Sequence, residues 1–166
     1  MNIQFRVAKM EDLPEVYSMF SSAISEMEKN NIFQWDNVYP DKKILSEDIQ
    51  RQQLYVGEVD CELVCAYVVN DNADEQYSNG TWKYVGCTYK ILHRLCVNPK
   101  FQNVGVGTET MLHIEKEAKK EGVESIRLDA FSKNPYAVQM YEKLNYTKVG
   151  VANWRKGRFY LMEKKL

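Results

Sequence analysis

Long hydrophobic runs are absent from this sequence. No apolar stretch approaches the roughly 18 residues that a membrane-spanning helix needs, and the chain begins with a strand-like pattern that lacks the apolar core of a signal peptide. Basic blocks are absent as well, because 22 Lys and Arg residues stand against 23 Asp and Glu residues, for a formal net charge of −1. These absences argue against membrane and nucleic-acid partners, and we expect a cytoplasmic protein.

Metal-binding patterns are also lacking. The sequence has four cysteines and two histidines, and no two cysteines form a C-x-x-C pair. Because zinc sites need closely spaced ligands, no metal is predicted. Three of the four cysteines lie in apolar or aromatic surroundings, which predicts free thiols packed as small hydrophobic side chains. The four are Cys61, Cys65, Cys87 and Cys96.

The length of 166 residues suits one domain, and we expect residues 1–166 to form it. Apolar side chains recur at strand and helix spacings in the order β-α-α-β-β-β-α-β-α-β-β, which predicts an α/β fold with a mixed sheet flanked by helices. The polar, aromatic-studded residues 71–90 form a long loop, a length more often functional than idle. Strands are expected at about 2–8, 54–59, 63–70, 91–97, 125–130, 147–151 and 158–163, and helices at about 13–29, 41–52, from the glycine loop to 121, and 135–144.

Two glycines, Gly105 and Gly107, stand where a helix follows a strand. Glycine permits positive φ or close approach of a ligand, and the N–H groups of a first helical turn suit a phosphate. A P-loop is excluded because no lysine follows Gly107. A dinucleotide-binding turn would use Asp129 at about the expected distance, but Thr110 replaces its third glycine and the turn is long.

A third alternative accounts for the whole stretch. HRLCVNPKFQNVGVGTETML is similar to the acetyl-CoA-binding motif Q/R-x-x-G-x-G/A of the GNAT superfamily of N-acetyltransferases, with Gln102–Gly107 as the motif. Downstream, NPYAVQMYEKLNY resembles the family's Asn-x-x-Ala helix with its tyrosine, although Asn145 and Tyr146 replace the usual Gly and Phe. Together with the element order, the resemblance covers nearly the full chain. It implies a GNAT-like fold and direct transfer of an acetyl group from acetyl-CoA to a primary amine of a small molecule or a protein.

The resemblance also implies where acetyl-CoA binds. The strand at 91–97 would splay from its neighbour and leave backbone groups free for the pantetheine arm, with one N–H holding the thioester oxygen. The glycine loop would wrap the pyrophosphate, and the helix after Asn134 would touch the CoA arm. The expected cofactor-binding residues are Leu95, Cys96, Val97, Gln102, Asn103, Val104, Gly105, Val106, Gly107, Thr108, Asn134 and Ala137.

Two residues are predicted to handle protons. Tyr141 matches the tyrosine that lies beside the CoA sulfur in many family members, and a phenol can protonate the departing thiolate; alternatively, it packs with Leu144 on the apolar face of its helix. His93 stands where the arylalkylamine branch of the superfamily carries a histidine, and its pKa range suits a general base. Alternatively, backbone groups of a crowded strand hydrogen-bond the His93 side chain. In that case an Asp, a Glu or a water chain serves as the base.

The acceptor is expected among the aromatic side chains of the early loop and the middle of the chain. Phe33, Trp35, Asp36 and Tyr89 are the predicted substrate-binding residues, which suits a cationic or amphipathic amine. The same aromatics could instead close the edge of the domain or form a dimer contact, and a homodimer is compatible with this fold. A non-catalytic CoA-binding sensor or scaffold, and more distantly a dinucleotide oxidoreductase, are the other function classes. Which amine and which acyl chain are used is not encoded in a recognisable motif.

Overall fold

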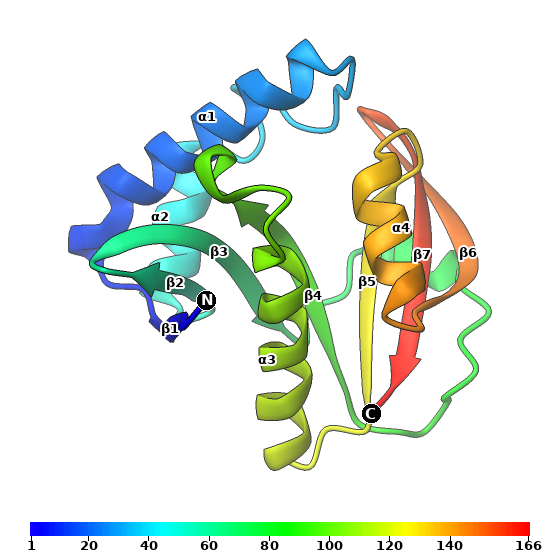
Figure 1. Cartoon of the computed structure of the whole chain (residues 1–166). Coiled ribbons are helices and arrows are strands. Elements are labelled where there is room, and N and C mark those ends of the chain that lie inside the picture. Colours follow the sequence, from blue (N-terminus) through cyan, green and yellow to red (C-terminus); the bar gives the residue numbers. More distant parts are fainter. The chain divides into compact units, whose positions relative to one another are not determined.

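The computed structural model describes residues 1–166, which fold into two compact units. The first comprises Met1–Val69 and Arg94–Thr110, and the second comprises Asn70–His93 and Met111–Leu166. Seven strands form a mixed sheet in the order β1-β2-β3-β4-β5-β7-β6 (Figure 1). The α/β class and the element order predicted from the sequence are both confirmed.

Most element boundaries agree with the predicted ones to within two residues. The first strand is shorter than predicted, and the C-terminal hairpin is longer. The strands are β1 (Gln4–Val7), β2 (Leu54–Val59), β3 (Glu62–Asn70), β4 (Tyr89–Val97), β5 (Ser125–Phe131), β6 (Thr147–Trp154) and β7 (Gly157–Lys165), the helices are α1 (Leu13–Lys29), α2 (Lys42–Gln50), α3 (Val106–Lys120) and α4 (Pro135–Lys143), and three 3-10 turns are η1 (Met10–Asp12), η2 (Glu75–Asn79) and η3 (Pro99–Phe101).

Helix ends follow local sequence rules. The Asn134 side chain accepts from Ala137 N–H at 3.2 Å and caps α4, as predicted. Gly122 ends α3 with φ +78°, and Asn145 follows α4 with φ +68°. Both residue types tolerate this left-handed backbone conformation, which explains why these boundaries could be predicted from sequence.

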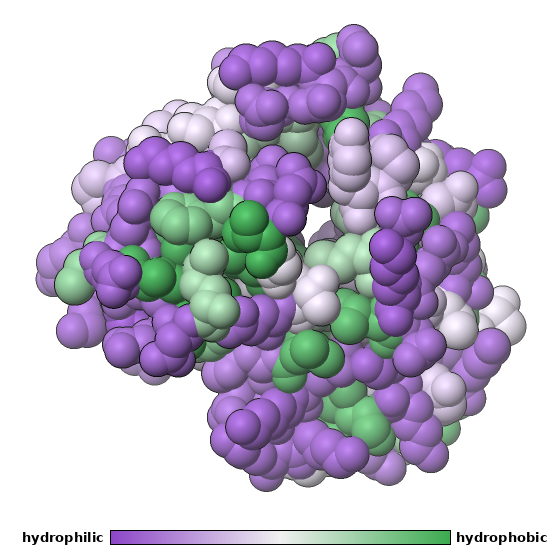
Figure 2. Space-filling model, in the orientation of Figure 1, coloured by the Kyte–Doolittle hydropathy of each residue, from purple (hydrophilic) through white to green (hydrophobic).

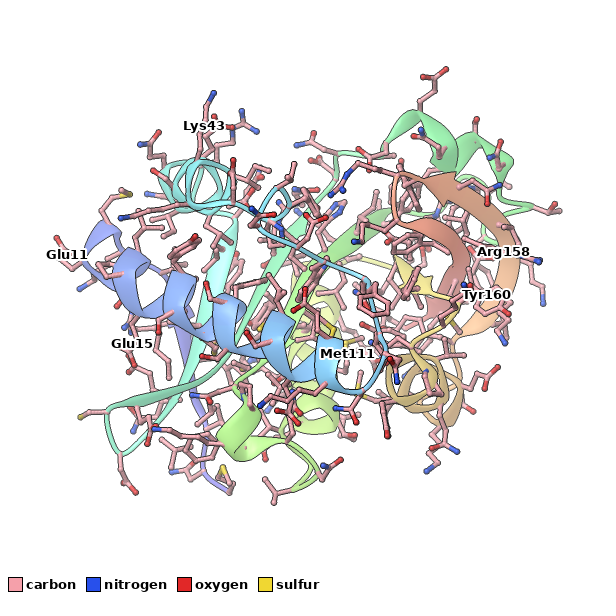
Figure 3. All side chains as sticks on the ribbon, turned by 90° about the horizontal axis from the view of Figure 1, so that it is seen from above. Glu11, Glu15, Lys43, Met111, Arg158 and Tyr160 are labelled. Atoms are coloured by element: carbon pink, nitrogen blue, oxygen red, sulfur yellow. The ribbon has the colours of Figure 1, made fainter.

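The first unit is built on the antiparallel strands β1, β2 and β3. Helix α1 buries a stripe of side chains that includes Val16, Phe20 and Ala23, all at most 4% exposed. Its opposite face is polar, and Figure 3 shows Glu11 just before the helix and Glu15 in its first turn. This amphipathic pattern packs α1 against the strands and leaves its charged side in water.

A buried ion pair fixes Arg94, where the part of β4 that belongs to the first unit begins. Arg94 adopts φ +50° in the middle of the strand, and its guanidinium donates to Asp48 Oδ1 of α2 at 2.7 Å and to the Tyr39 hydroxyl at 2.8 Å. The two charged side chains are only 12% and 7% exposed. Because left-handed backbone is unfavourable for a residue with a side chain, these contacts stabilise a conformation that the local sequence does not prefer.

Replacement of Asp48 by alanine should therefore destabilise the fold. Removing one partner of a buried ion pair leaves the other charge without compensation, which typically costs about 3–5 kcal/mol. Urea unfolding measures this change in the free energy of unfolding. Lys43→Ala is the control, because Lys43 reaches Glu47 only at 4.0 Å and is 83% exposed (Figure 3). Equal midpoints for the two variants would contradict the role given to the Asp48–Arg94 pair.

The second unit contains the parallel pairing of β4 with β5 and the antiparallel set β5, β7 and β6. The register of β4 with β5 runs from Tyr89↔Ser125 to Leu92↔Leu128. Helix α3 is attached to β7 by the half-buried ion pair between Lys164 Nζ and Glu115 Oε2, 2.5 Å apart. The outer end of α3 is hydrophilic, as Figure 2 shows, and carries Lys119 and Lys120.

The long segment 71–88 is ordered by contacts with the sheet. Arg127 of β5 lies between the rings of Trp82 and Tyr89, with its guanidinium carbon 4.4 Å and 3.9 Å from their centroids. Glu163, fully buried on β7, is the cross-strand partner of Arg127 and accepts the N–H of Lys83. The segment is therefore a covering layer of the second unit, a role that its polar composition did not indicate.

Candidate functional site

The loop that begins α3 exposes backbone N–H groups. Asn103 and Gly105 have φ +62° and φ +94°, and a Cβ built on Gly105 would meet no atom within 4 Å. Conformation rather than crowding therefore requires glycine at position 105. The N–H of Glu109 donates to Gly105 C=O at 3.0 Å, so the N–H groups of Val106–Thr108 precede the helix ladder and point out of the helix end.

These features fit an anionic group such as a pyrophosphate. The N-terminal end of a 15-residue helix carries partial positive charge, and Asn103, Val104 and Gly105 are exposed. The second glycine of the loop has an ordinary helical backbone. Gly107 is the second residue of α3 and is not among the residues with positive φ, so of the two reasons given for a glycine here, close approach of another group is the one that remains.

Thr110 argues against the dinucleotide alternative. It stands where a third glycine would be needed, but it is fully buried, donates to Val106 C=O at 2.8 Å and lies 3.3 Å from Cys65 Sγ. A side chain in this position fills the space that a dinucleotide-binding helix keeps open with glycine.

The end of β4 lies beyond the pairing of this strand with β5. Cys96 is buried in the apolar core, and burial raises the pKa of its thiol, whereas Leu95 and Val97 are half-buried. The register of β4 with β5 ends at Leu92, ahead of these three residues. Their pairing with a pantetheine arm stays a prediction.

The cysteine prediction holds in part. All four thiols are free, and Cys65 and Cys96 are buried. Burial raises the pKa of Cys65 to about 11, so this thiol is unreactive near neutral pH. Cys61 is exposed in the β2–β3 turn and Cys87 is half-exposed, so the expectation of three buried cysteines was wrong. Turn geometry, and not hydrophobicity, decides the exposure of Cys61, which has φ +64°.

Tyr141 is buried on α4 in the second unit. It is 6% exposed and packs edge-on against Tyr146, with ring centroids 5.8 Å apart. Burial, and after it the negative charge of Asp129, raises the pKa of Tyr141 above its ordinary value. The phenol therefore keeps its proton at neutral pH and could donate it. The packing role considered for Tyr141 is thus present, and it is compatible with an acid role.

His93 lies on β4, half-buried, with Nε2 3.0 Å from Asn70 Oδ1. With the amide oxygen as acceptor, Nε2 carries the proton and Nδ1 the lone pair. The second histidine, His113, is half-buried on α3, where burial lowers its pKa. His93 is thus hydrogen-bonded to a side chain on β3. This resembles the alternative in which His93 has a structural role, although the partner is a side chain and not backbone.

The predicted acceptor residues divide into two groups. Phe33 is 52% exposed, and Asp36 Oδ1 accepts the N–H groups of the next loop residues at 3.0 and 3.1 Å. In contrast, Trp35 is 8% exposed and packs on Phe20 at 5.4 Å, and the ring of Tyr89 faces Arg127. Trp35 and Tyr89 therefore serve packing, because core and cation contacts already cover their rings, and we leave them out of the acceptor site.

An open, solvent-facing cavity of about 290 Å³ lies between α1 and the loop after it, and Asp36 is the predicted acceptor residue that lines it. Side chains at positions 17, 21, 24 and 28 of α1 contribute one wall, which is the spacing of a single helix face. Two carboxylates face this space. The lining residues are Tyr17, Ser21, Ile24, Glu28, Asp36, Asn37 and Pro40.

No helix is long and apolar enough to cross a bilayer. No group of three or more His, Cys, Asp and Glu side chains is arranged to hold a metal ion.

Comparison with known proteins gives a consistent result. The model of the acetyltransferase (GNAT) family matches residues 26–146, whereas no curated protein matches the sequence. A GNAT-family acetyltransferase from Streptococcus agalactiae 2603 has a TM-score of 0.85 at 21% identity, covering 99% of this chain and 95% of that one. A GNAT-family acetyltransferase from Listeria monocytogenes 4b F2365 has 0.78 at 20%, covering 99% and 95%. The PaiA N-acetyltransferase of Thermoplasma acidophilum, solved with coenzyme A, has 0.70 at 22%, covering 100% of both chains.

Proposed function

This chain belongs to the acetyltransferase (GNAT) family, whose members transfer an acyl group from acetyl-CoA, and we propose that its acceptor is a cationic primary amine. The amine is carried by a small molecule or by a protein, and the acetyl group passes to it directly. We further propose that residues 1–166 act as a single cytoplasmic domain.

The observation that carries the donor side is the loop Gln102–Thr108. Its positive-φ glycine and the unpaired N–H groups at the start of α3 supply several donors and a partial positive charge for the pyrophosphate of acetyl-CoA. Backbone groups of Leu95–Val97 bind the pantetheine arm, and one of these N–H groups stabilises the oxyanion of the thioester as the amine attacks. Asn134 and Ala137, at the start of α4, contact the CoA arm.

Two proton transfers complete the reaction. Tyr141 protonates the departing thiolate, and its raised pKa means that the hydroxyl still carries its proton at working pH. His93 stays a predicted base, with Nδ1 as the nitrogen that would accept a proton.

The cavity along α1 supports a cationic acceptor. Glu28 and Asp36 place two carboxylates beside Tyr17 and Ile24, and such a mixed lining suits an ammonium group on an apolar stem. Phe33 extends the apolar surface of the same loop. Polyamines, aminoglycosides, arylalkylamines, amino acids and peptide N-termini all contain a suitable amine.

An amine screen tests the proposal. Calorimetry with acetyl-CoA, CoA and NADH should give binding of the first two only, and thiol release should then identify an amine that turns over. For a diamine, Glu28→Gln should raise KM about fivefold, the effect of losing one exposed charge contact, while an amine with a neutral tail is unaffected. Glu26→Gln is the matched control, since Glu26 pairs with Lys29 instead.

The other function classes give different results. Acetyl-CoA binding without turnover of any amine would favour the CoA-binding sensor or scaffold. Binding of NADH alone would overturn the proposal. If the acceptor is neutral and its KM is the same for Glu28→Gln and Glu26→Gln, the proposal of a cationic acceptor is wrong.

A further inference from the structure

A buried tyrosine and a carboxylate are joined in the second unit. The hydroxyl of Tyr77, which is 3% exposed, donates to Asp129 Oδ2 at 2.8 Å. The Tyr77 ring is stacked on Trp82 with centroids 5.6 Å apart, and the Trp82 indole N–H donates to Tyr77 C=O at 2.8 Å. The phenol is therefore fixed from two directions and holds the carboxylate in one orientation.

Asp129 is the accessible polar residue of its part of β5. It is half-buried, whereas its neighbours Leu128 and Ala130 are buried. Because side chains alternate along a strand, Asp129 points to the face opposite to these neighbours. The last pair in the β4–β5 register is Leu92↔Leu128, so His93 and Asp129 are the next residues of two parallel strands. They lie at the point where that register ends.

None of the roles assigned so far uses this carboxylate. We propose that Asp129 accepts the proton of the acceptor's ammonium group, and that Tyr77 is its positioning residue. This inference rests on the proposed amine acceptor. Asp129 and not His93 is then the general base.

The proton and electron pairs balance without a further reagent. The Asp129 carboxylate takes one proton from R–NH₃⁺, and the nitrogen lone pair that this frees forms the C–N bond to the thioester carbon. The C–S bond breaks, its electron pair stays on sulfur, and the thiolate takes the Tyr141 proton. The amide nitrogen then loses its extra proton, and Tyr141 regains a proton through solvent. Asp129 releases its proton to water.

Charged groups around Asp129 favour this assignment. The positive charge of Arg127, two residues earlier on the same face, is held between two aromatic rings and opposite Glu163, so it is largely compensated. Tyr77 and Tyr141 keep their protons, because burial first and the Asp129 charge next raise the pKa of each. The side chain across the β5–β7 pair is the apolar Leu161. The titratable groups that act on Asp129 include Tyr77 from η2 and Tyr141 from α4. Arg127 lies two residues earlier on β5, and His93 of β4 follows the last pair of the β4–β5 register.

Asp129→Asn tests the proposal, because asparagine can still accept from Tyr77. At neutral pH, kcat/KM for the amine found by the screen should fall about 10²–10⁴-fold, the usual contribution of a general base. The defect should shrink tenfold per pH unit as pH approaches the pKa of the amine, since solvent then supplies the neutral nucleophile. The affinity for acetyl-CoA, measured by calorimetry, should not change. Asp74→Asn is the matched control, an exposed aspartate just before η2.

Tyr77→Phe provides a second, independent readout. Loss of a donor to the carboxylate disfavours its charged form, so the acidic limb of kcat/KM should move to higher pH by about one unit. The plateau above that limb should be retained. A shift in the limb would not arise from a change in folding alone.

Three results would overturn the proposal. They are activity of Asp129→Asn within twofold of the wild type, a defect that is equal at every pH, and a pH-dependent defect in His93→Gln in place of Asp129→Asn. Failure of the proposed function is seen separately, because it requires the wild-type chain itself to release no thiol with any amine.

Discussion

Replacing Gly105 by glutamate is expected to weaken acetyl-CoA binding at least about 100-fold. Two effects combine. The side chain disfavours the φ of +94° by roughly 1–2 kcal/mol, which is about tenfold in affinity if the free loop relaxes to another conformation. The carboxylate then lies beside the site for a doubly charged pyrophosphate, where like-charge repulsion costs at least as much.

Calorimetry on three variants separates these effects. Gly105→Ala carries the conformational cost without the charge and should lose up to about tenfold in affinity. Gly122→Glu is the control, because Gly122 has φ +78° and also meets no atom within 4 Å of a Cβ, but it lies at the other end of α3. Wild-type affinity in Gly105→Glu would refute the assignment of this loop to the pyrophosphate.

This loop illustrates what local sequence can predict. A strand, a glycine with positive φ and a helix N-terminus are all set by neighbouring residues, so their order could be inferred before any coordinates. The same holds for the caps at Asn134 and Gly122. For Gly107 the sequence left positive φ and close approach both open, and the helical backbone of the structure removes the first.

The residues that sequence reasoning missed depend on distant partners. Tyr77 meets Asp129 across 52 positions, and no periodicity links them. Trp35 was expected at a binding surface because its loop is rich in aromatic residues, yet its ring is in the core against Phe20. Arg94 takes a left-handed conformation that its contacts with Asp48 and Tyr39 stabilise. Tertiary packing determines these positions and conformations, and it overrides the conformational preferences of the local sequence.

Tyr141→Phe is expected to lower kcat about 100-fold, at the lower end of the range for loss of a general acid. The substitution keeps the ring, and therefore the edge-on contact with Tyr146, but removes the proton that the thiolate would receive. Since this hydroxyl acts only as the C–S bond breaks, the affinity for acetyl-CoA should stay within about twofold.

A matched control separates proton donation from packing. Tyr146→Phe removes a hydroxyl from the adjoining ring, which is 2% exposed, so a purely structural effect should appear in both variants. If Tyr141 is the acid, only Tyr141→Phe slows turnover. Because its pKa is raised by burial, the wild-type kcat should also show no basic limb from this group below about pH 10, its ordinary value. Equal turnover in Tyr141→Phe and the wild type would leave solvent as the proton donor and reduce Tyr141 to its packing role.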